Sequence, residues 1–303
     1  MKQPSFFIVG APKCGTTALC KYLNRHPDIF IPQLKEIKYF DKDFINKRRN
    51  QTLEDYLRFF EEGQNKICGE GSPTYLRSQV AAQEIRNFNP DAKIIIMLRE
   101  PVSLLYSLHS QRLWNGSSED IQDFKLAMEA EADRRQGRRI PEKCTNIEKL
   151  FYRSAVNFTT QIERYFSAFG RENVHIIIFD DFKQKTRDTY RETLIFLGVD
   201  PNFETDFNKI NANRKVRSRF LQTLVKYPPA KVLEIGKFLI PLPQTQRRAL
   251  LEAAKSSLRH FNKNKTKRPP LDAEFEKSLK REFAPEVERL SRLIGRDLTY
   301  WSQ

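Results

Sequence analysis

The stretch FFIVGAPKCGTTALCKYL, which covers residues 6–23, decides the fold. It begins with a short apolar run, passes through a turn that contains two glycines, and continues with a pattern typical of a helix. A buried strand, a glycine-containing turn and a helix are the parts of a loop that cradles phosphate groups. The sequence therefore predicts a P-loop near the amino terminus of an α/β domain.

The spacing of this loop departs from the triphosphate-binding version in one position. Gly10 and Gly15 keep the glycine spacing of the motif G-x-x-x-x-G-K-[ST], and Thr17 fills its last position. Thr16, however, stands where the motif has its lysine, and the lysine of this loop is Lys13. A triphosphatase uses the lysine after the second glycine, together with a bound Mg²⁺, to stabilise the β- and γ-phosphates.

A second part of the triphosphate-binding machinery is also missing. The magnesium ion of such an enzyme needs an acidic residue at the end of a second strand. The apolar run IIIML (residues 94–98) is followed by Arg99 instead. The remaining features predict a cradle for a smaller anion, with Lys13 over the middle of the loop. The alternative for the loop taken alone is a strand–turn–helix corner without a ligand.

Apolar runs and helical patterns alternate along the first two thirds of the chain. Continuous apolar runs, typical of strands buried on both faces of a parallel sheet, occupy residues 6–9, 94–98 and 174–179, with a shorter candidate at 66–68. Helical patterns occupy residues 17–25, 53–60, 74–88, 102–113, 155–169 and 187–197. This alternation predicts an α/β fold: a P-loop-containing, doubly wound parallel sheet flanked by helices.

The strand signals stop after Asn208, and the remaining sequence predicts helices broken by proline-containing turns. We expect one domain over residues 1–303, with a core at 5–200 and a basic, helical C-terminal part at 208–303. Residues 208–270 hold sixteen Lys or Arg and two acids, within a chain of net charge +15. Such a segment is either a solvated basic face or a field that attracts an anionic cofactor, an acidic acceptor or a membrane surface.

Composition and motifs exclude several other classes of protein. The four cysteines are scattered, and neither a secretory signal nor an apolar run of roughly 18 residues is present, which predicts a cytoplasmic protein without a membrane span. The four histidines are dispersed, so no metal site is expected. No nucleic-acid-binding motif is present, and no nucleic-acid partner is expected. No helix shows a heptad stripe, so the oligomeric state stays open.

The motif PKCGTTAL (residues 12–19) resembles the 5′-phosphosulfate loop of sulfotransferases that use 3′-phosphoadenosine 5′-phosphosulfate (PAPS). The resemblance implies that Lys13, Cys14, Gly15, Thr16 and Thr17 bind this cofactor, and that Lys13 contacts the bridging oxygen and the sulfonate. It also accounts for the displaced lysine, because the bond to be broken lies in the 5′ anhydride and not between β- and γ-phosphates.

A second motif, IIIMLREPVSLLYSLHSQR (residues 94–112), resembles the element of the same family that binds the 3′-phosphate. The resemblance assigns this role to Arg99 and Ser107. An arginine gives a phosphate a planar, multi-donor contact, and a serine eight residues later lies about two turns into the next helix. Taken singly, a salt-bridged arginine and a surface serine are the alternative.

A third motif, PQLKEIKYFDKDF (residues 32–44), resembles the K-E-x-x-F-F segment of the carbohydrate-type branch, which includes the heparan sulfate sulfotransferases. The resemblance implies that Glu36 is the base on the acceptor hydroxyl and that Lys13 balances charge on the departing phosphate. Lys35 and Lys38 would hold Glu36 ionised and could touch the sulfonate. A surface helix start with mixed charges is the alternative.

A fourth motif, GEGSPTYL (residues 69–76), resembles a segment that lines the acceptor side, which makes Glu70 and Tyr75 substrate-binding candidates together with Lys38. The alternative is a strand-to-helix turn capped by Ser72. The late cofactor loop of the family has no clean counterpart. NKNKTKRPPLD (residues 262–272) occupies a comparable place, and we expect Lys267 and Arg268 to reach the 3′-phosphate.

Two departures fall on the acceptor side. Gly71 stands where animal carbohydrate-type members often carry lysine, and Lys38 stands where they carry histidine. Together the motifs predict a PAPS-dependent sulfotransferase related to the carbohydrate branch, of bacterial soluble type. It would sulfonate a hydroxyl or amine on a small molecule, lipid or saccharide. The alternatives are a P-loop nucleotide kinase or NTPase and a non-catalytic polyanion-binding protein.

Overall fold

The computed structural model describes residues 2–34, 36–44, 50–115, 119–142, 144, 146–208, 214–216, 263–265 and 268–303. The strands are β1 (Phe6–Gly10), β2 (Ile29–Phe30), β3 (Ile67–Gly71), β4 (Lys93–Leu98), β5 (Val174–Ile178), β6 (Arg214–Val216) and β7 (Lys263–Lys265). The α-helices are α1 (Thr16–Leu23), α2 (Leu53–Leu57), α3 (Ala81–Phe88), α4 (Pro101–Asn115), α5 (Phe124–Glu129), α6 (Glu131–Arg135), α7 (Phe158–Phe169), α8 (Phe179–Gln184), α9 (Thr186–Leu197) and α13 (Ala273–Ile294). Short 3₁₀ helices include η1 (Arg58–Gly63) and η3 (Arg153–Val156).

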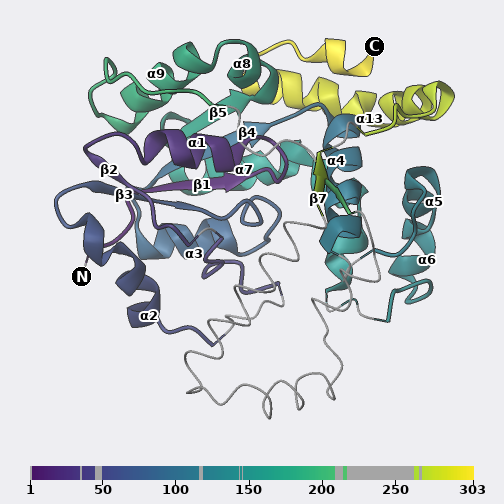
Figure 1. Cartoon of the computed structure of the whole chain (residues 1–303), viewed down its shortest axis with the longest axis horizontal. Coiled ribbons are helices and arrows are strands. Elements are labelled where there is room, and N and C mark those ends of the chain that lie inside the picture. Colours follow the sequence, from purple (N-terminus) through teal and green to yellow (C-terminus); the bar gives the residue numbers. More distant parts are fainter. Residues whose placement is uncertain are drawn as a thin grey trace.

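The centre of the fold is a five-stranded sheet with the strand order β2-β3-β1-β4-β5, in which every neighbouring pair is parallel. Parallel strands need crossover connections, and the connecting helices cover both faces of the sheet. α1 contacts α9 over one face, and α3 contacts α7 over the other (Figure 1). The predicted doubly wound α/β fold is confirmed.

The sheet places the loop after β1 where ligands bind in such folds. From β1 the chain turns toward β3 and β2, whereas β4 and β5 lie on the other side of β1. Strand order reverses at this point, and open α/β sheets bind ligands in the crevice at the carboxyl ends of the two strands there. The loop that contains Lys13 follows β1, and Arg99 follows β4.

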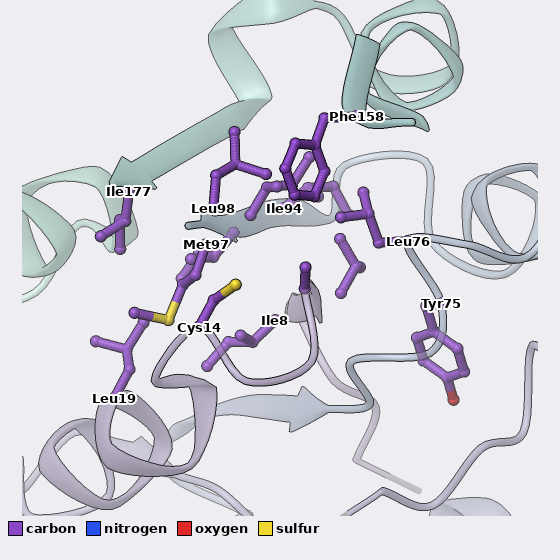
Figure 2. Packing of buried hydrophobic residues seen from close by; sticks show 14 of the residues in the cluster. Ile8, Cys14, Leu19, Tyr75, Leu76, Ile94, Met97, Leu98, Phe158 and Ile177 are labelled. Atoms are coloured by element: carbon purple, nitrogen blue, oxygen red, sulfur yellow. The ribbon is translucent and has the colours of Figure 1, made fainter. Parts of the chain in front are cut away.

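The core explains why the strands lack polar alternation. All five residues of β1 and the last five of β4 are buried. Figure 2 shows Ile8, Met97 and Leu98 packed with Leu19 of α1 and Phe158 of α7. Burial of each such side chain contributes about 1.5–3 kcal/mol, so the core holds the P-loop from below as well as joining the layers.

Several elements differ from the sequence prediction. β2 was not predicted. It has two residues, which pair with β3, and it is too short to give a continuous apolar run. The helix expected from residue 74 begins at Ala81, because Ser78 Oγ accepts the backbone N–H of Ala81 at 2.9 Å and ends the preceding turn. The C-terminal part also contains an antiparallel pair, β6 with β7, where only helices were expected. Most of the basic segment 208–270 lies outside the described residues.

The end of the chain packs back onto the core. Asp272 caps α13, and the Glu286 carboxylate on this helix accepts the backbone N–H of Thr159 on α7 at 2.7 Å. Trp301 is buried. Gly198 ends α9 with φ 78° and ψ 34°, the left-handed conformation that glycine adopts readily after a helix. The described C-terminal residues thus belong to the same packed body as the sheet.

Candidate active site

The loop between β1 and α1 has the backbone of an anion cradle. Gly15 caps α1 with φ 93°, and Lys13 has φ 69°, so both residues adopt the left-handed conformation. A β-carbon at Gly15 would lie 3.2 Å from atoms of the Phe182 ring and 3.3 Å from the Phe179 ring. Glycine is therefore required for both conformation and space. The amino end of α1 adds its positive dipole at the loop.

Cys14 lies in the loop but faces the interior. Its side chain is fully buried and points toward the core beside Ile8 and Met97 (Figure 2). Burial raises the pKa of its thiol to about 12. Its backbone N–H donates to the Ala11 carbonyl oxygen at 3.3 Å. Cys14 therefore anchors the underside of the loop in this structure. Thr16 is buried and Thr17 partly buried at the start of α1.

Arg99 ties the end of β4 to the loop. Its Nη1 donates to the carbonyl oxygen of Lys13 at 3.4 Å, and its guanidinium lies 4.8 Å from the centre of the Phe179 ring. Ser107 lies in α4 and is 5% exposed. The structure thus places the Arg99 guanidinium against the backbone of Lys13.

Arg268 reaches the same place from the C-terminal part of the chain. β6 contacts α4, and Arg268 comes three residues after the end of its partner β7. The Arg268 guanidinium lies 5.3 Å from the centre of the Tyr106 ring, and Tyr106 Oη donates to the Pro269 carbonyl oxygen at 3.0 Å. Tyr106 was not predicted, because a tyrosine on a mostly apolar helix gives no signal of this role. Lys267 lies outside the described residues.

The positive charges of Lys13, Arg99 and Arg268 lie close enough to repel one another. Burial lowers the pKa of Lys13, and the positive charges of Arg268 and Arg99 lower it further. Burial and the charge of Arg99 lower the pKa of Arg268 in the same way. Repulsion between partly buried positive charges raises the free energy of the unliganded loop, and a bound anion would offset this repulsion.

Glu36 and Lys38 form an adjacent ion pair. Glu36 Oε2 lies 3.0 Å from Lys38 Nζ, and the Glu36 side chain is 43% exposed. The negative charge of Glu36 partly offsets the lowering of the Lys13 pKa, so the carboxylate lies within electrostatic range of Lys13. Both residues have positive φ, 57° and 59°. The sequence-predicted base therefore lies beside the loop. Lys35 lies outside the described residues.

Glu70 and Tyr75 lie beneath this segment and not on its surface. They are 1% and 0% exposed, respectively. The Tyr75 hydroxyl donates to the Glu70 carboxylate and accepts the backbone N–H groups of Tyr39 and Phe40. The structure therefore differs from the sequence expectation for these two residues: their polar atoms face protein groups. The signal that could have shown this is the short apolar run at residues 66–68, since Glu70 continues the same buried strand.

Two further cations extend the site away from the loop. The pKa of Lys149 is lowered by burial and by the charges of Lys38 and Arg112. Arg112 is 6% exposed and lies 4.2 Å from the centre of the Tyr152 ring. Sequence reasoning missed both. Among the residues that the structure describes, no group of three His, Cys, Asp or Glu could hold a metal ion. No helix in the described part of the chain is long and apolar enough to cross a membrane.

Fold and loop together define a P-loop α/β protein whose cradle suits a small anionic group. The chain belongs to the sulfotransferase family, since the family model for the sulfotransferase domain matches residues 3–219. A crystal structure of a sulfotransferase from Alicyclobacillus acidocaldarius superposes with a TM-score of 0.72 at 27% identity and covers 100% of both chains. The bacterial relationship expected from the sequence agrees with this neighbour.

Curated relatives include carbohydrate enzymes. Heparan sulfate glucosamine 3-O-sulfotransferase 5 of Mus musculus is 26% identical over 215 residues, which are 70% of this chain and 58% of that protein. Bifunctional heparan sulfate N-deacetylase/N-sulfotransferase 3 of Mus musculus is 26% identical over 208 residues, 67% of this chain and 23% of that protein. Membrane-associated sulfotransferase kil1 of Dictyostelium discoideum is 35% identical over 103 residues, 33% of this chain and 21% of that protein. The chain thus spans between 21% and 58% of the length of these relatives.

Proposed function

We propose that this protein transfers a sulfuryl group from PAPS to a hydroxyl or amine of a small-molecule, lipid or saccharide acceptor. The observation that carries the proposal is the convergence of Lys13, Arg99 and Arg268 on the loop between β1 and α1. Three cations suit a cofactor with two separate anionic groups better than a single phosphate. Family membership supports the same cofactor.

The residues of the loop fit the phosphosulfate end of PAPS. The amino end of α1 and the hydroxyls of Thr16 and Thr17 would hold the 5′ group. The Lys13 ammonium would neutralise charge that develops on the departing phosphate oxygen. Gly15 leaves the space that a β-carbon would fill. When bound, PAPS supplies the activated sulfuryl group.

The 3′-phosphate would be held by residues from three parts of the chain. Arg99 at the end of β4, Ser107 in α4 and Arg268 beside Tyr106 form this group. The guanidinium fork gives a phosphate paired hydrogen bonds. An NTPase would instead need an acidic residue at the end of β4 to hold Mg²⁺, and Arg99 stands there.

Glu36 is the proposed base. Its side chain is 43% exposed and lies within electrostatic range of Lys13, so we expect an acceptor hydroxyl to reach it from solvent. As that oxygen attacks in line, Glu36 would take its proton. Lys38 Nζ lies 3.0 Å from this carboxylate, so its positive charge stands beside the proposed base. The identity of the acceptor and the cytoplasmic location stay predictions.

Binding of adenosine 3′,5′-bisphosphate, the product left after transfer, tests the cofactor assignment by calorimetry. We expect selective binding over ATP with magnesium, weakened roughly 10- to 100-fold in Lys13→Ala and in Arg99→Ala. Matched controls are Lys21→Ala and Arg191→Ala, which change exposed side chains on α1 and α9. Equal binding of ATP, or binding that ignores Lys13 and Arg99, would overturn the proposal.

Transfer from ³⁵S-labelled PAPS to a panel of hydroxyl and amine acceptors tests the base. Glu36→Gln should bind the bisphosphate normally and lose transfer, because the amide cannot take a proton. Glu192→Gln, an exposed change in α9, is the matched control. Unchanged transfer in Glu36→Gln would remove Glu36 from the mechanism without affecting the cofactor assignment.

A further inference from the structure

Residues 36–41, called here the Glu36 segment, have a strained backbone whose conformation must be stabilised by surrounding contacts. Glu36 and Lys38 both have positive φ, which costs an ordinary residue about 1–2 kcal/mol each. Such conformations persist only where surrounding contacts impose them. The backbone contacts of the segment therefore show what holds the proposed base in place.

Two hydroxyls accept the backbone N–H groups of this segment. Ser72 Oγ accepts from Lys38 N at 3.1 Å. Tyr75 Oη accepts from Tyr39 N at 2.9 Å and from Phe40 N at 3.3 Å. A further contact comes from the backbone, where Glu36 N donates to the Gly71 carbonyl oxygen at 3.2 Å. All four bonds join the segment to the chain that leaves β3.

Both hydroxyls donate their single hydrogen to one carboxylate. Ser72 Oγ donates to Glu70 Oε1, and Tyr75 Oη donates to Oε1 at 2.9 Å and Oε2 at 3.1 Å. Tyr56 Oη donates to Oε2 at 2.8 Å, and the Tyr56 ring stacks on Tyr39 with centroids 4.6 Å apart. Glu70 is thus the shared acceptor beneath the segment.

The direction of these bonds depends on an acceptor-only group at the centre. An ionised carboxylate accepts and never donates, so each hydroxyl turns its hydrogen toward Glu70 and its lone pairs toward the segment. A group that donates would force one hydroxyl to turn its hydrogen elsewhere, where it competes with a backbone N–H. Figure 2 shows the Tyr75 oxygen directed away from the labelled apolar side chains.

We propose that Glu70 is a positioning residue for the sulfuryl transfer, which fixes the Glu36 segment through Ser72 and Tyr75 without touching the acceptor. The inference rests on the proposed role of Glu36. It adds a residue that acts through two hydroxyls on the backbone of the base. Loss of the shared acceptor would loosen the segment and misplace the base while leaving the cofactor cradle unchanged.

The surroundings of Glu70 make its hydrogen bonds with Ser72 and Tyr75 sensitive to pH. Burial raises its pKa to about 7, although hydrogen bonds from Ser72, Tyr56 and Tyr75 lower it. The charged or titratable groups near it include Tyr56 from α2, Tyr75 from its own turn, Asp41 from the Glu36 segment and Tyr165 from α7. Asp41 raises the pKa of Glu70 further. Below about pH 7 Glu70 takes up a proton and becomes a donor, which works against the arrangement.

Hydrogen–deuterium exchange tests the hold on the segment without using activity. In Glu70→Gln and in Ser72→Ala we expect the amides of residues 38–40 to exchange about tenfold faster than in the parent protein, with β4 and β5 unchanged. Tyr190→Phe, which removes a buried hydroxyl bonded to the Tyr22 carbonyl oxygen, is the matched control. Faster exchange throughout the sheet, or no change at 38–40, would overturn the inference. Ser72→Ala removes few atoms and decides the matter if Glu70→Gln fails to fold.

Kinetics test the consequence for transfer. Glu70→Gln should lower kcat roughly 10- to 100-fold with the affinity for the bisphosphate unchanged. The parent protein should show a fall in kcat below about pH 7, and the variant should not. Glu70→Asp, which restores an acceptor-only group, should recover part of kcat. An unchanged kcat and pH profile would refute the positioning role. If the parent protein itself transfers no sulfuryl group, the proposed function fails, and the exchange experiment still decides whether Glu70 holds the segment.

Discussion

Arg99 Nη1 donates to the backbone carbonyl oxygen of Lys13, a bond of 3.4 Å that joins the end of β4 to the loop after β1. The same guanidinium packs on the Phe179 ring at 4.8 Å. One side chain thus contacts both the loop after β1 and the Phe179 ring, next to the proposed site of the cofactor. These contacts explain why the arginine follows a buried strand, since the sheet fixes its starting point within the core.

Replacement of Arg99 by lysine should therefore not be conservative. Lysine keeps the positive charge but loses the planar fork and the stack on Phe179. We expect calorimetry to show roughly tenfold weaker binding of adenosine 3′,5′-bisphosphate in Arg99→Lys, with a near-normal thermal midpoint. Arg191→Lys on α9 is the control. Equal affinities would mean that charge alone matters at this position.

A β-carbon at Gly15 should damage the cradle. Alanine must adopt φ 93° and meet the Phe182 and Phe179 rings at 3.2–3.3 Å. We expect Gly15→Ala to lower the free energy of unfolding by about 1–3 kcal/mol and to weaken bisphosphate binding more than tenfold. Gly137→Ala separates the two causes, because Gly137 has φ 79° with no atom within 4 Å of the added carbon. Similar binding losses in both variants would contradict a local effect.

The Tyr106 ring should strengthen cofactor binding by positioning Arg268. Tyr106→Ala removes the face on which the guanidinium packs and the hydrogen bond to Pro269, whereas Tyr106→Phe removes the hydrogen bond alone. A cation–π contact contributes about 0.5–2 kcal/mol, so the alanine variant should bind the bisphosphate roughly 3- to 30-fold more weakly and the phenylalanine variant less so. Tyr300→Ala, which changes an exposed side chain, serves as the control. An alanine variant with parental affinity would show that the contact between Tyr106 and Arg268 does not contribute to binding.

The sequence predicts the sheet and cradle well for a physical reason. β1 and β4 are buried on both faces, so they appear as continuous apolar runs, and the loop needs Gly15 at one fixed place. β2 leaves no such signal, because a strand of two residues is too short to appear as a continuous apolar run in the sequence. The strands β6 and β7 were missed as well, because polar residues dominate both.

The inner support of the site is harder to predict. In GEGSPTYL a polar residue at the end of a strand fits acceptor binding and hydrogen bonding beneath a loop equally well. Only the packing of α2 and the Glu36 segment over Glu70 and Tyr75 decides between these roles. Arg268 was expected from a basic stretch, but its partner Tyr106 lies 162 positions earlier in the sequence, a contact that no local pattern encodes.

A buried ion pair should govern stability away from the site. Arg134 donates two hydrogen bonds to Glu119, at 2.8 and 2.6 Å, and Tyr152 Oη donates a third at 2.8 Å. Burial would raise the pKa of Glu119, but these bonds outweigh it and the pKa lies below its usual value. Glu119→Gln should lower the free energy of unfolding by about 3–5 kcal/mol, because it leaves a buried arginine charge without its counterion.

Urea denaturation of the single and double variants checks this expectation. Glu119→Gln combined with Arg134→Met removes the unpaired charge and should recover much of the loss. The exposed pair Arg187–Glu204 supplies the control, since Glu204→Gln should change stability little. A double variant as unstable as the single one would show that packing, and not charge, is responsible.

His175 should make the protein lose stability in acid. Its ring stacks on Phe196 with centroids 5.1 Å apart, and burial lowers its pKa to about 4. In the unfolded chain the pKa is about 6.5, so between these values the unfolded state binds more protons than the folded state. The stability that neutral His175 contributes is complete above pH 6.5 and is lost as the pH falls toward 4. The loss amounts to about 3 kcal/mol at most.

Comparison with His175→Gln isolates this effect. The raised pKa values of Glu70, about 7, and Asp41, about 6, have the opposite sign, because their contribution is lost as pH rises through those values. Both groups are present in parent and variant, so they cancel in the difference between the two unfolding free energies. Measured by urea denaturation from pH 7 to pH 4.5, the parent should lose roughly 1.4 kcal/mol per pH unit more than the variant in the lower part of that range. Parallel curves would show that His175 titrates alike in both states, and the acid sensitivity would then have to come from another buried group.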